Sequence, residues 1–254
     1  MTDSFDEAGL RRACGGIPDL AVFAADVCDS TNLRAQEWLA VGNRGAALFA
    51  AEKQTSGRGR LGRTFHSPAG SGVYFSLTYP MRRSLDETVG VTCAAAVAVM
   101  RTIRACSGKQ TEIKWVNDLF LNGKKVCGIL AEAVSVGSET SIVVGIGINL
   151  RTADFPPELE AVAGSIGDDR TPRAELIAAV VRELLPYLQD PARRDWLDDY
   201  RAHSCVIGRK IVFRRGGDSV QAKAIGIDGN GGLIVVTNRG TEILRTGEIT
   251  VRIC

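Results

Sequence analysis

The segment from Glu52 to Arg63 places the tightest constraint on the fold, because glycine and arginine alternate almost strictly from Gly57 onward. An apolar run at 46–51 precedes it and an alternating run at 72–79 follows it, so both flanks are predicted strands. A stretch this rich in glycine forms a loop between them. Its glycines allow the backbone to approach a ligand closely, and its arginines carry planar charged groups suited to carboxylate or phosphate.

Three interpretations of this loop are open at this point. It encloses a small anion, it is a solvated basic surface loop, or it is a nucleic-acid-binding segment of the Arg/Gly-rich kind. The whole chain has 31 basic and 29 acidic residues, a net charge of +2. Such a balance implies no broad attraction to nucleic acid or to a membrane. The positive charge is concentrated at Arg58, Arg60 and Arg63, which favours a specific anionic ligand.

The remaining composition is typical of a globular protein in a reducing compartment. A chain of 254 residues with 45% hydrophobic content can build one large core and a small second domain. Seven scattered cysteines without CxxC pairs predict reduced thiols and a cytoplasmic location. With only His66 and His203, no His-rich metal site is expected. The N-terminus lacks a signal-peptide pattern and the apolar stretch at 89–100 is too short for a membrane span, so no membrane association is predicted.

The order of the predicted elements indicates an α+β fold with a mostly antiparallel sheet, because the strands form hairpins and the helices gather elsewhere. Asn122-Gly123 is a strong hairpin signal. After Cys205, five short strands separated by glycine-rich turns predict a small β-barrel, so we expect domains at 1–205 and 206–254. Strands are predicted at 20–25, 46–51, 72–79, 126–133 and 140–150, and helices at 5–14, 33–40, 87–104, 172–188 and 191–203.

Several polar or glycine positions admit both a structural and a functional interpretation. The Ser-Thr-Asn run at 30–32 either caps the helix that follows or presents hydroxyl and N–H groups to a polar ligand. Lys114 stands in an otherwise apolar strand, where its ammonium either reaches solvent or supplies a positive charge for a phosphate in a cleft. Gly145 and Gly147 lie inside a predicted strand, which indicates close approach of a ligand or of another backbone.

Five motifs, in this order along the chain, resemble those of the biotin–protein ligases: DSTN (29–32), GRGRLGR (57–63), KWVND (114–118), GKKVCGILAE (123–132) and GIGIN (145–149). The similarity runs from about residue 20 to the C-terminus. Val116 stands where many members have proline and Phe65 where many have tryptophan, and both replacements are apolar. Regulatory members carry an N-terminal DNA-binding helix-turn-helix. Nothing before residue 20 is long enough for one, so the resemblance is to the short form and no DNA binding is expected.

The resemblance implies a fold and an activity. The fold is a class II synthetase-like catalytic domain, followed by a small SH3-like β-barrel. The activity is ATP-dependent ligation of biotin, through biotinyl-5′-AMP, to a lysine of the biotin carboxyl carrier domain of a biotin-dependent carboxylase. ATP is expected to bring Mg²⁺ with it. Members often pair through sheet edges, so a homodimer is a further expectation.

The resemblance also implies roles for the residues that match the motifs. Lys114, Arg58 and Arg60 are the expected catalytic residues, which hold the biotin carboxylate and the α-phosphate. Asn149 is expected to read the adenine edge, while these same three cations contact the adenylate. The expected biotin contacts are Ser30, Thr31, Asn32, Gln54, Arg58, Gly59, Arg60, Lys114, Gly128, Gly145 and Gly147.

Other interpretations stay open. Trp115 and Phe65 are either apolar walls of the pocket or core residues. Lys125 either faces solvent or binds ATP or the carrier, and Asp118 either contacts Mg²⁺ through water or caps a turn. A lipoate or octanoate ligase shares the catalytic fold and is the nearest rival enzyme. A nucleic-acid-binding protein is the rival of a different class.

Overall fold

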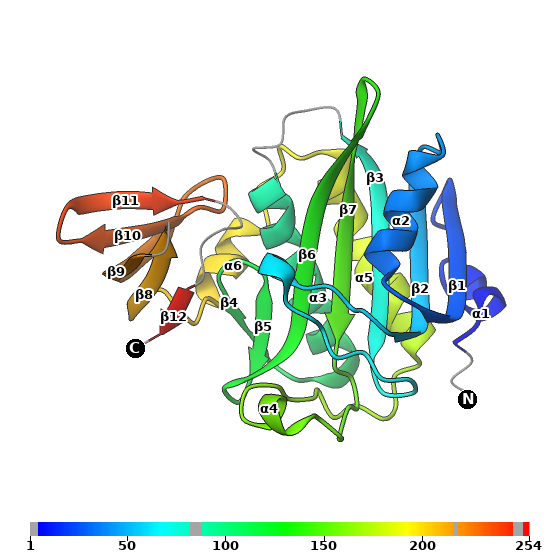
Figure 1. The fold of residues 1–254 in the computed structure, drawn as a ribbon, viewed down its shortest axis with the longest axis horizontal. Helices are drawn as coiled ribbons and strands as arrows, with labels where there is room; N and C mark the ends of the chain where they lie inside the picture. The colour runs from blue at the N-terminus through cyan, green and yellow to red at the C-terminus, as the bar shows by residue number, and fades with distance from the viewer. Residues whose placement is uncertain (1–4, 82–87, 216–217, 246–250, 254) are drawn as a thin grey trace.

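The computed structural model describes residues 5–81, 88–215, 218–245 and 251–253. These residues form a seven-stranded mixed sheet flanked by helices and a separate five-stranded antiparallel sheet near the C-terminus (Figure 1). The predicted α+β class, with a small C-terminal β-domain, is therefore confirmed.

The large sheet has the strand order β1-β2-β3-β7-β6-β5-β4. Only β1 and β2 run parallel, because α2 crosses over between them; the other neighbours in this sheet are antiparallel. Its strands are β1 (Leu20–Cys28), β2 (Ala46–Gln54), β3 (Val73–Met81), β4 (Glu112–Lys114), β5 (Asp118–Leu121), β6 (Lys124–Val136) and β7 (Glu139–Ile148). The helices are α1 (Glu7–Ala13), α2 (Thr31–Ala40), the short 3₁₀ turn η1 (Arg60–Gly62), α3 (Thr88–Ser107), α4 (Pro157–Glu160), α5 (Arg173–Gln189) and α6 (Leu197–Ala202).

The small sheet has the order β11-β10-β9-β8-β12. It lies beside the β4 end of the large sheet (Figure 1). Its strands are β8 (Lys210–Arg215), β9 (Asp218–Ile227), β10 (Leu233–Thr237), β11 (Gly240–Leu244) and β12 (Val251–Ile253).

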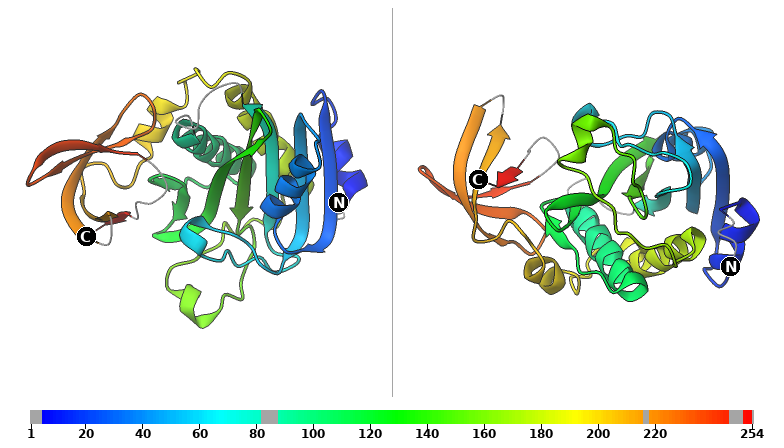
Figure 2. Two further views of the ribbon diagram at one scale, coloured as in Figure 1. Left: turned by 45° about the horizontal axis from the view of Figure 1, so that its top comes forward. Right: turned by 90° about the horizontal axis from the view of Figure 1, so that it is seen from below.

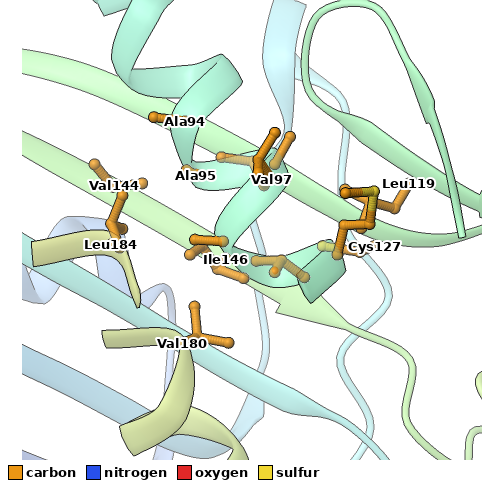
Figure 3. Close-up of a cluster of buried hydrophobic side chains, with 14 of the residues drawn as sticks. Ala94, Ala95, Val97, Leu119, Cys127, Val144, Ile146, Val180 and Leu184 are labelled. Atoms are coloured by element: carbon orange, nitrogen blue, oxygen red, sulfur yellow. The ribbon is translucent and has the colours of Figure 1, made fainter. Parts of the chain in front are cut away.

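The two faces of the large sheet are covered differently. Helices α3 and α5 pack together on one face, and α2 covers the β2–β3 side of the other (Figures 1 and 2). Because strand side chains alternate between faces, Val144 and Ile146 of β7 reach the main core, where Figure 3 shows them with Val97, Val180 and Leu184. Burial of such side chains supplies most of the stabilisation.

The opposite face of β7 changes character along the strand. Val143 packs in a second cluster with Ala35 and Leu39 of α2. The next two residues on that face are Gly145 and Gly147, which carry no side chain. This face of the sheet therefore has a hollow next to the N-terminal end of α2. The Gly/Arg loop runs over this hollow.

Two sequence expectations are corrected. The helix predicted at 191–203 is confined to α6, Leu197–Ala202. Outside it, Asp190 accepts the N–H of Ala192 and the Arg194 guanidinium donates to the carbonyl of Pro191, so side chains satisfy these backbone groups without a helix.

The apolar helix α3 is also longer than the sequence suggested. Its Val89–Ser107 segment is long and apolar enough to cross a membrane by length and composition alone. However, 67% of its most apolar window is buried inside the protein, where it packs against the sheet and α5. We therefore assign it as a core helix, and the cytoplasmic location stays a prediction.

Candidate active site

A cavity of about 160 Å³ lies over the hollowed face of the large sheet. Segments far apart in the sequence meet there, from the β1–α2 junction, the Gly/Arg loop, the β4–β5 turn, β6 and β7. Its lining includes Ser30, Thr31, Asn32, Gln54, Arg58, Gly59, Arg60, Phe65, Lys114, Trp115, Asn117, Asp118, Lys125, Gly128, Gly145 and Gly147. Every predicted biotin-contacting residue is among them.

The Gly/Arg loop folds back on itself as a small hairpin. The Phe65 amide donates to the Gly57 carbonyl at 2.8 Å, and the Gly59 amide donates to the Arg63 carbonyl at 2.7 Å. Glycine is required at position 57, because a Cβ there would overlap the Phe65 carbonyl and lie 2.8 Å from Ser67 Oγ. The loop is thus more ordered than its composition suggested, and it directs arginine side chains into the cavity.

Arg60 reaches across the cavity to the β4–β5 turn. Its Nη1 donates to Asn117 Oδ1 at 2.8 Å, and the Asn117 amide donates to the Ile129 carbonyl at 2.8 Å. Burial, followed by the charge of Arg63, lowers the pKa of Arg60. The guanidinium group of arginine is effectively always protonated in proteins. A partly desolvated cation is therefore held at the cavity by a neutral amide.

Arg58 meets a carboxylate to which the sequence analysis gave no role. Its Nη2 lies 3.5 Å from Glu132 Oε1. The other oxygen, Oε2, accepts from Asn32 Nδ2 at 2.7 Å and from Gln36 Nε2 at 3.1 Å. Glu132 thus joins the loop to α2. The only sequence signal for it was its place as the last residue of GKKVCGILAE.

A neutral polar cluster forms the part of the cavity next to α2. Gln54 Oε1 accepts from the Thr31 amide at 2.8 Å and lies 3.2 Å from the Thr31 hydroxyl. Ser76 Oγ, fully buried, lies 2.8 Å from Thr31 Oγ1 and 2.6 Å from Asn32 Oδ1. Ser30 occupies the N-cap position of α2, but its side chain makes no capping hydrogen bond. The capping interpretation is therefore wrong for the Ser30 side chain, which instead lines the cavity.

The three glycines of β6 and β7 that were expected to contact biotin make room for specific neighbours. A Cβ on Gly145 would overlap Asn32 Oδ1, and a Cβ on Gly147 would lie 2.5 Å from the Phe65 ring. A Cβ on Gly128 would lie 3.0 Å from Lys125 Nζ and 3.2 Å from the same ring. Phe65 is therefore a wall of the cavity rather than a core residue.

Lys114 ends β4 at the same cavity. Its Nζ lies 5.3 Å from the centre of the Phe120 ring, and it forms no ion pair with the residues that the structure describes. Lys125, by contrast, is paired with Asp118 at 2.6 Å. Within the described residues, Asp118 is the single carboxylate in the lining. The cavity is therefore strongly cationic, which suits a ligand with two anionic groups.

Asn149 does not line this cavity. Its Nδ2 donates to the Gly164 carbonyl at 3.0 Å, and its Oδ1 is buried without a hydrogen-bond partner among the described residues. A contact between Asn149 and adenine therefore stays a prediction.

Fold and cavity together define an α+β protein with a small cavity rich in positive charge, and comparison with known proteins identifies its class. The sequence model of the biotin/lipoate A/B protein ligase family matches residues 25–149, and that of the biotin protein ligase C terminal domain matches residues 206–252. The bifunctional ligase/repressor BirA of Bacillus subtilis is 34% identical over 237 residues, which span 88% of this chain and 72% of the relative. The biotin–[acetyl-CoA-carboxylase] ligase of Paracoccus denitrificans is 32% identical over 237 residues, 87% and 96% of the two chains.

Solved structures share the fold. The biotin protein ligase of Aquifex aeolicus, in complex with biotin and ATP, has a TM-score of 0.77 at 24% identity and covers 92% of this chain and 99% of its own. That of Leishmania major, in complex with biotinyl-5-AMP, has a TM-score of 0.60 at 22% identity, with 90% and 99% covered.

The chain belongs to the biotin protein ligase family. It is a ligase that acts on biotin, as the order of its motifs predicted.

Proposed function

We propose that this enzyme joins biotin to a lysine of a biotin carboxyl carrier domain in two steps, through biotinyl-5′-AMP. The observation that carries the proposal is that one cavity combines the cations Arg58, Arg60 and Lys114 with a neutral hydrogen-bonding cluster. Biotin has the matching halves, a carboxylate and a neutral ureido ring. The complexes of the Aquifex and Leishmania proteins with biotin, ATP and biotinyl-5-AMP support the same chemistry.

In the first step, a carboxylate oxygen of biotin attacks the α-phosphorus of ATP. A new O–P bond forms, the bond to the bridging oxygen breaks, and pyrophosphate leaves with the bond pair. Two anions must approach each other, so the reaction depends on cations placed where charge develops. We assign this task to Lys114, Arg58 and Arg60. Removal of one such contact costs about 3 kcal/mol in comparable transition states.

The ureido ring needs partners that the polar cluster next to α2 can supply. Ser30, Thr31 and Gln54 offer hydroxyl and amide groups within one small region of the cavity. A ring with two N–H donors and one carbonyl loses affinity when such groups are buried unpaired. An acyl chain without this ring could not form these hydrogen bonds with the protein, which favours biotin over lipoate as the substrate.

In the second step, the amine of a carrier lysine attacks the acyl carbon of the mixed anhydride. The new C–N bond forms, the C–O bond to phosphate breaks, AMP leaves and the amine loses a proton. Water competes for the same carbon, so the intermediate must be shielded until the carrier docks. The hairpin formed by the Gly/Arg loop runs over the cavity and is the candidate for this shield.

Mg²⁺ would be held mainly by the phosphates of ATP and by water, with Asp118 as the carboxylate available in the described lining of the cavity. The donor set fits this limited role, because Asp118 is already paired with Lys125 and the described residues contain no group of three or more possible metal ligands. When bound, Mg²⁺ would neutralise part of the negative charge of the ATP phosphates.

The proposal is tested by incubation of the enzyme with an apo carrier domain, MgATP and biotin, followed by intact-mass measurement of the carrier. We expect the mass of one biotinyl group to be added, and replacement of the acceptor lysine by arginine should prevent it. Lipoate in place of biotin is the matched substrate control. Efficient transfer of lipoate but not of biotin would contradict the proposal.

A further inference from the structure

We propose that the turn at 228–232 in the C-terminal β-domain positions the segment that carries Lys114, through a hydrogen bond between Gly231 and Trp115. The inference rests on the proposed function, because it takes Lys114 as a group that acts at the α-phosphorus. It assigns to the small β-domain a part in the first chemical step. Trp115 and Gly231 are positioning residues in this proposal.

The contact itself is buried and specific. Trp115 Nε1 donates to the Gly231 carbonyl at 2.9 Å across the boundary between the two sheets. Trp115 is 4% exposed, follows Lys114 directly in the chain and lines the cavity. Cys93 Sγ of α3 lies 3.8 Å from the same carbonyl. A buried N–H and carbonyl are unfavourable when unpaired, so this pair selects one placement of the indole.

The turn is held in shape by its own β-domain. Asp228 Oδ1 accepts the amides of Asn230 and Gly232, each at 2.8 Å, and Arg245 reaches Asp228 Oδ2 at 2.7 Å. The Asp228 amide also donates to the Gly232 carbonyl at 2.9 Å. The direction of the Gly231 carbonyl is thus fixed before it meets Trp115.

Strand β4, which ends at Lys114, needs contacts from outside the large sheet to hold its position, because it has only three residues and is the edge strand of that sheet. Its free edge is covered by the segment that leads into the β-domain, since the Ile113 amide donates to the His203 carbonyl at 2.8 Å and the Cys205 amide donates to the Ile113 carbonyl at 3.0 Å. The buried Tyr200 hydroxyl donates to the Val116 carbonyl at 3.1 Å. The connection to the β-domain therefore contacts the chain on both sides of Lys114, as the closeness of β4, α6 and β8 in Figure 1 indicates.

Glycine is required at position 231 for two reasons. Its φ of +88° is unfavourable for residues with a side chain. A Cβ there would lie 2.9 Å from Cys93 Sγ, 3.3 Å from Val89 Cγ1 and 3.5 Å from Trp196. Gly231→Ala should therefore displace the turn and its carbonyl.

The same turn supplies a matched control. Gly229 is exposed, and a Cβ there would meet nothing within 4 Å. Gly229→Ala thus adds the same methyl group to the same turn without a steric conflict.

The proposal predicts which kinetic constant changes. The neutral polar cluster assigned to biotin lies at the start of α2 and the end of β2. Among the described residues, the hydrogen bonds of the 228–232 turn go to other segments. Lys114 is one of several expected biotin contacts, so its misplacement should weaken transition-state stabilisation more than it weakens biotin binding. We expect kcat for biotin-dependent ATP–pyrophosphate exchange to fall about tenfold in Gly231→Ala, with KM for biotin within about twofold of wild type.

The experiment compares wild type, Gly231→Ala, Gly229→Ala and Trp115→Phe by exchange kinetics. The indole N–H resonance of Trp115, assigned by its loss in Trp115→Phe, reports the hydrogen bond in ¹⁵N NMR spectra. We expect this resonance to move in Gly231→Ala and to stay in place in Gly229→Ala, which should keep wild-type kcat. Trp115→Phe keeps an aromatic ring but not the donor, so its kcat should fall like that of Gly231→Ala.

Wild-type kcat in Gly231→Ala despite a shifted indole resonance would overturn the inference. If Gly231→Ala does not fold, Trp115→Phe decides, and normal kcat in that folded variant would overturn it equally. Absence of biotin-dependent exchange in the wild-type enzyme would instead be a failure of the proposed function.

Discussion

Replacement of Gly145 by alanine tests the packing that shapes the cavity. The added Cβ would overlap Asn32 Oδ1 and lie 2.8 Å from Asn32 Cγ. Asn32 has little freedom to move, because it is 4% exposed and bonds to Glu132 at 2.7 Å and to Ser76 at 2.6 Å. The methyl group must therefore either displace Asn32 or push the strand away.

The cost follows from these contacts. An extra methyl group in a well-packed site costs about 1–3 kcal/mol. Displacement of Asn32 breaks two hydrogen bonds, each worth about 1 kcal/mol. We therefore expect the free energy of unfolding of Gly145→Ala to fall by about 3–5 kcal/mol. At about 2–4 °C per kcal/mol for a chain of this size, Tm should fall by about 10 °C.

Urea unfolding of Gly145→Ala, Asn32→Ala and the double variant separates the clash from the lost hydrogen bonds. Asn32→Ala removes the atoms that the new methyl group meets. The loss of unfolding free energy in the double variant should therefore be about 1–3 kcal/mol smaller than the sum of the losses in the two single variants. Additive effects within about 0.5 kcal/mol would refute the claim that position 145 is glycine to accommodate Asn32.

Three further substitutions test individual roles in the cavity. Lys114→Ala should lower biotin-dependent ATP–pyrophosphate exchange by about 100- to 1,000-fold, with Tm almost unchanged because Lys114 forms no ion pair among the described residues; near-normal exchange would mean that the charge comes from elsewhere. Arg60→Gly should release biotinyl-AMP into solution, because loop closure loses the contact with Asn117; unchanged retention in a filter-binding assay would remove the shielding role. Glu132→Gln should lower the free energy of unfolding by about 1–2 kcal/mol, because Asn32 loses a charged acceptor; an unchanged urea midpoint would show that Glu132 does not hold this network together.

Local patterns were sufficient for most of the fold. The alternation of apolar residues located the strands, and the Asn122-Gly123 signal placed a hairpin where both residues have positive φ, 51° and 76°. The sequence also indicated positions that must lack a side chain, because glycine weakens a strand and is typical of places where a ligand or another part of the chain comes close. Gly145 and Gly147 are the clearest cases.

Contacts between distant segments were beyond the reach of such patterns. Glu132 meets Asn32 across 100 residues, and Gly231 meets Trp115 across 116. No local periodicity encodes these partners, because they depend on how the sheet is assembled. The direction of the Asn149 side chain was inaccessible for the same reason. The helix predicted at 191–203 was wrong over its first half because side-chain hydrogen bonds replaced helical ones there.

The most direct test of the account is to ask what the cavity holds after reaction. The enzyme is incubated with biotin and MgATP without a carrier, passed through a desalting column, denatured, and the released small molecules are identified by mass spectrometry. We predict close to one equivalent of biotinyl-5′-AMP per chain, and almost none from Lys114→Ala. Recovery of only unreacted biotin and ATP from the wild-type enzyme would contradict the claim that this cationic cavity makes and retains an acyl-adenylate.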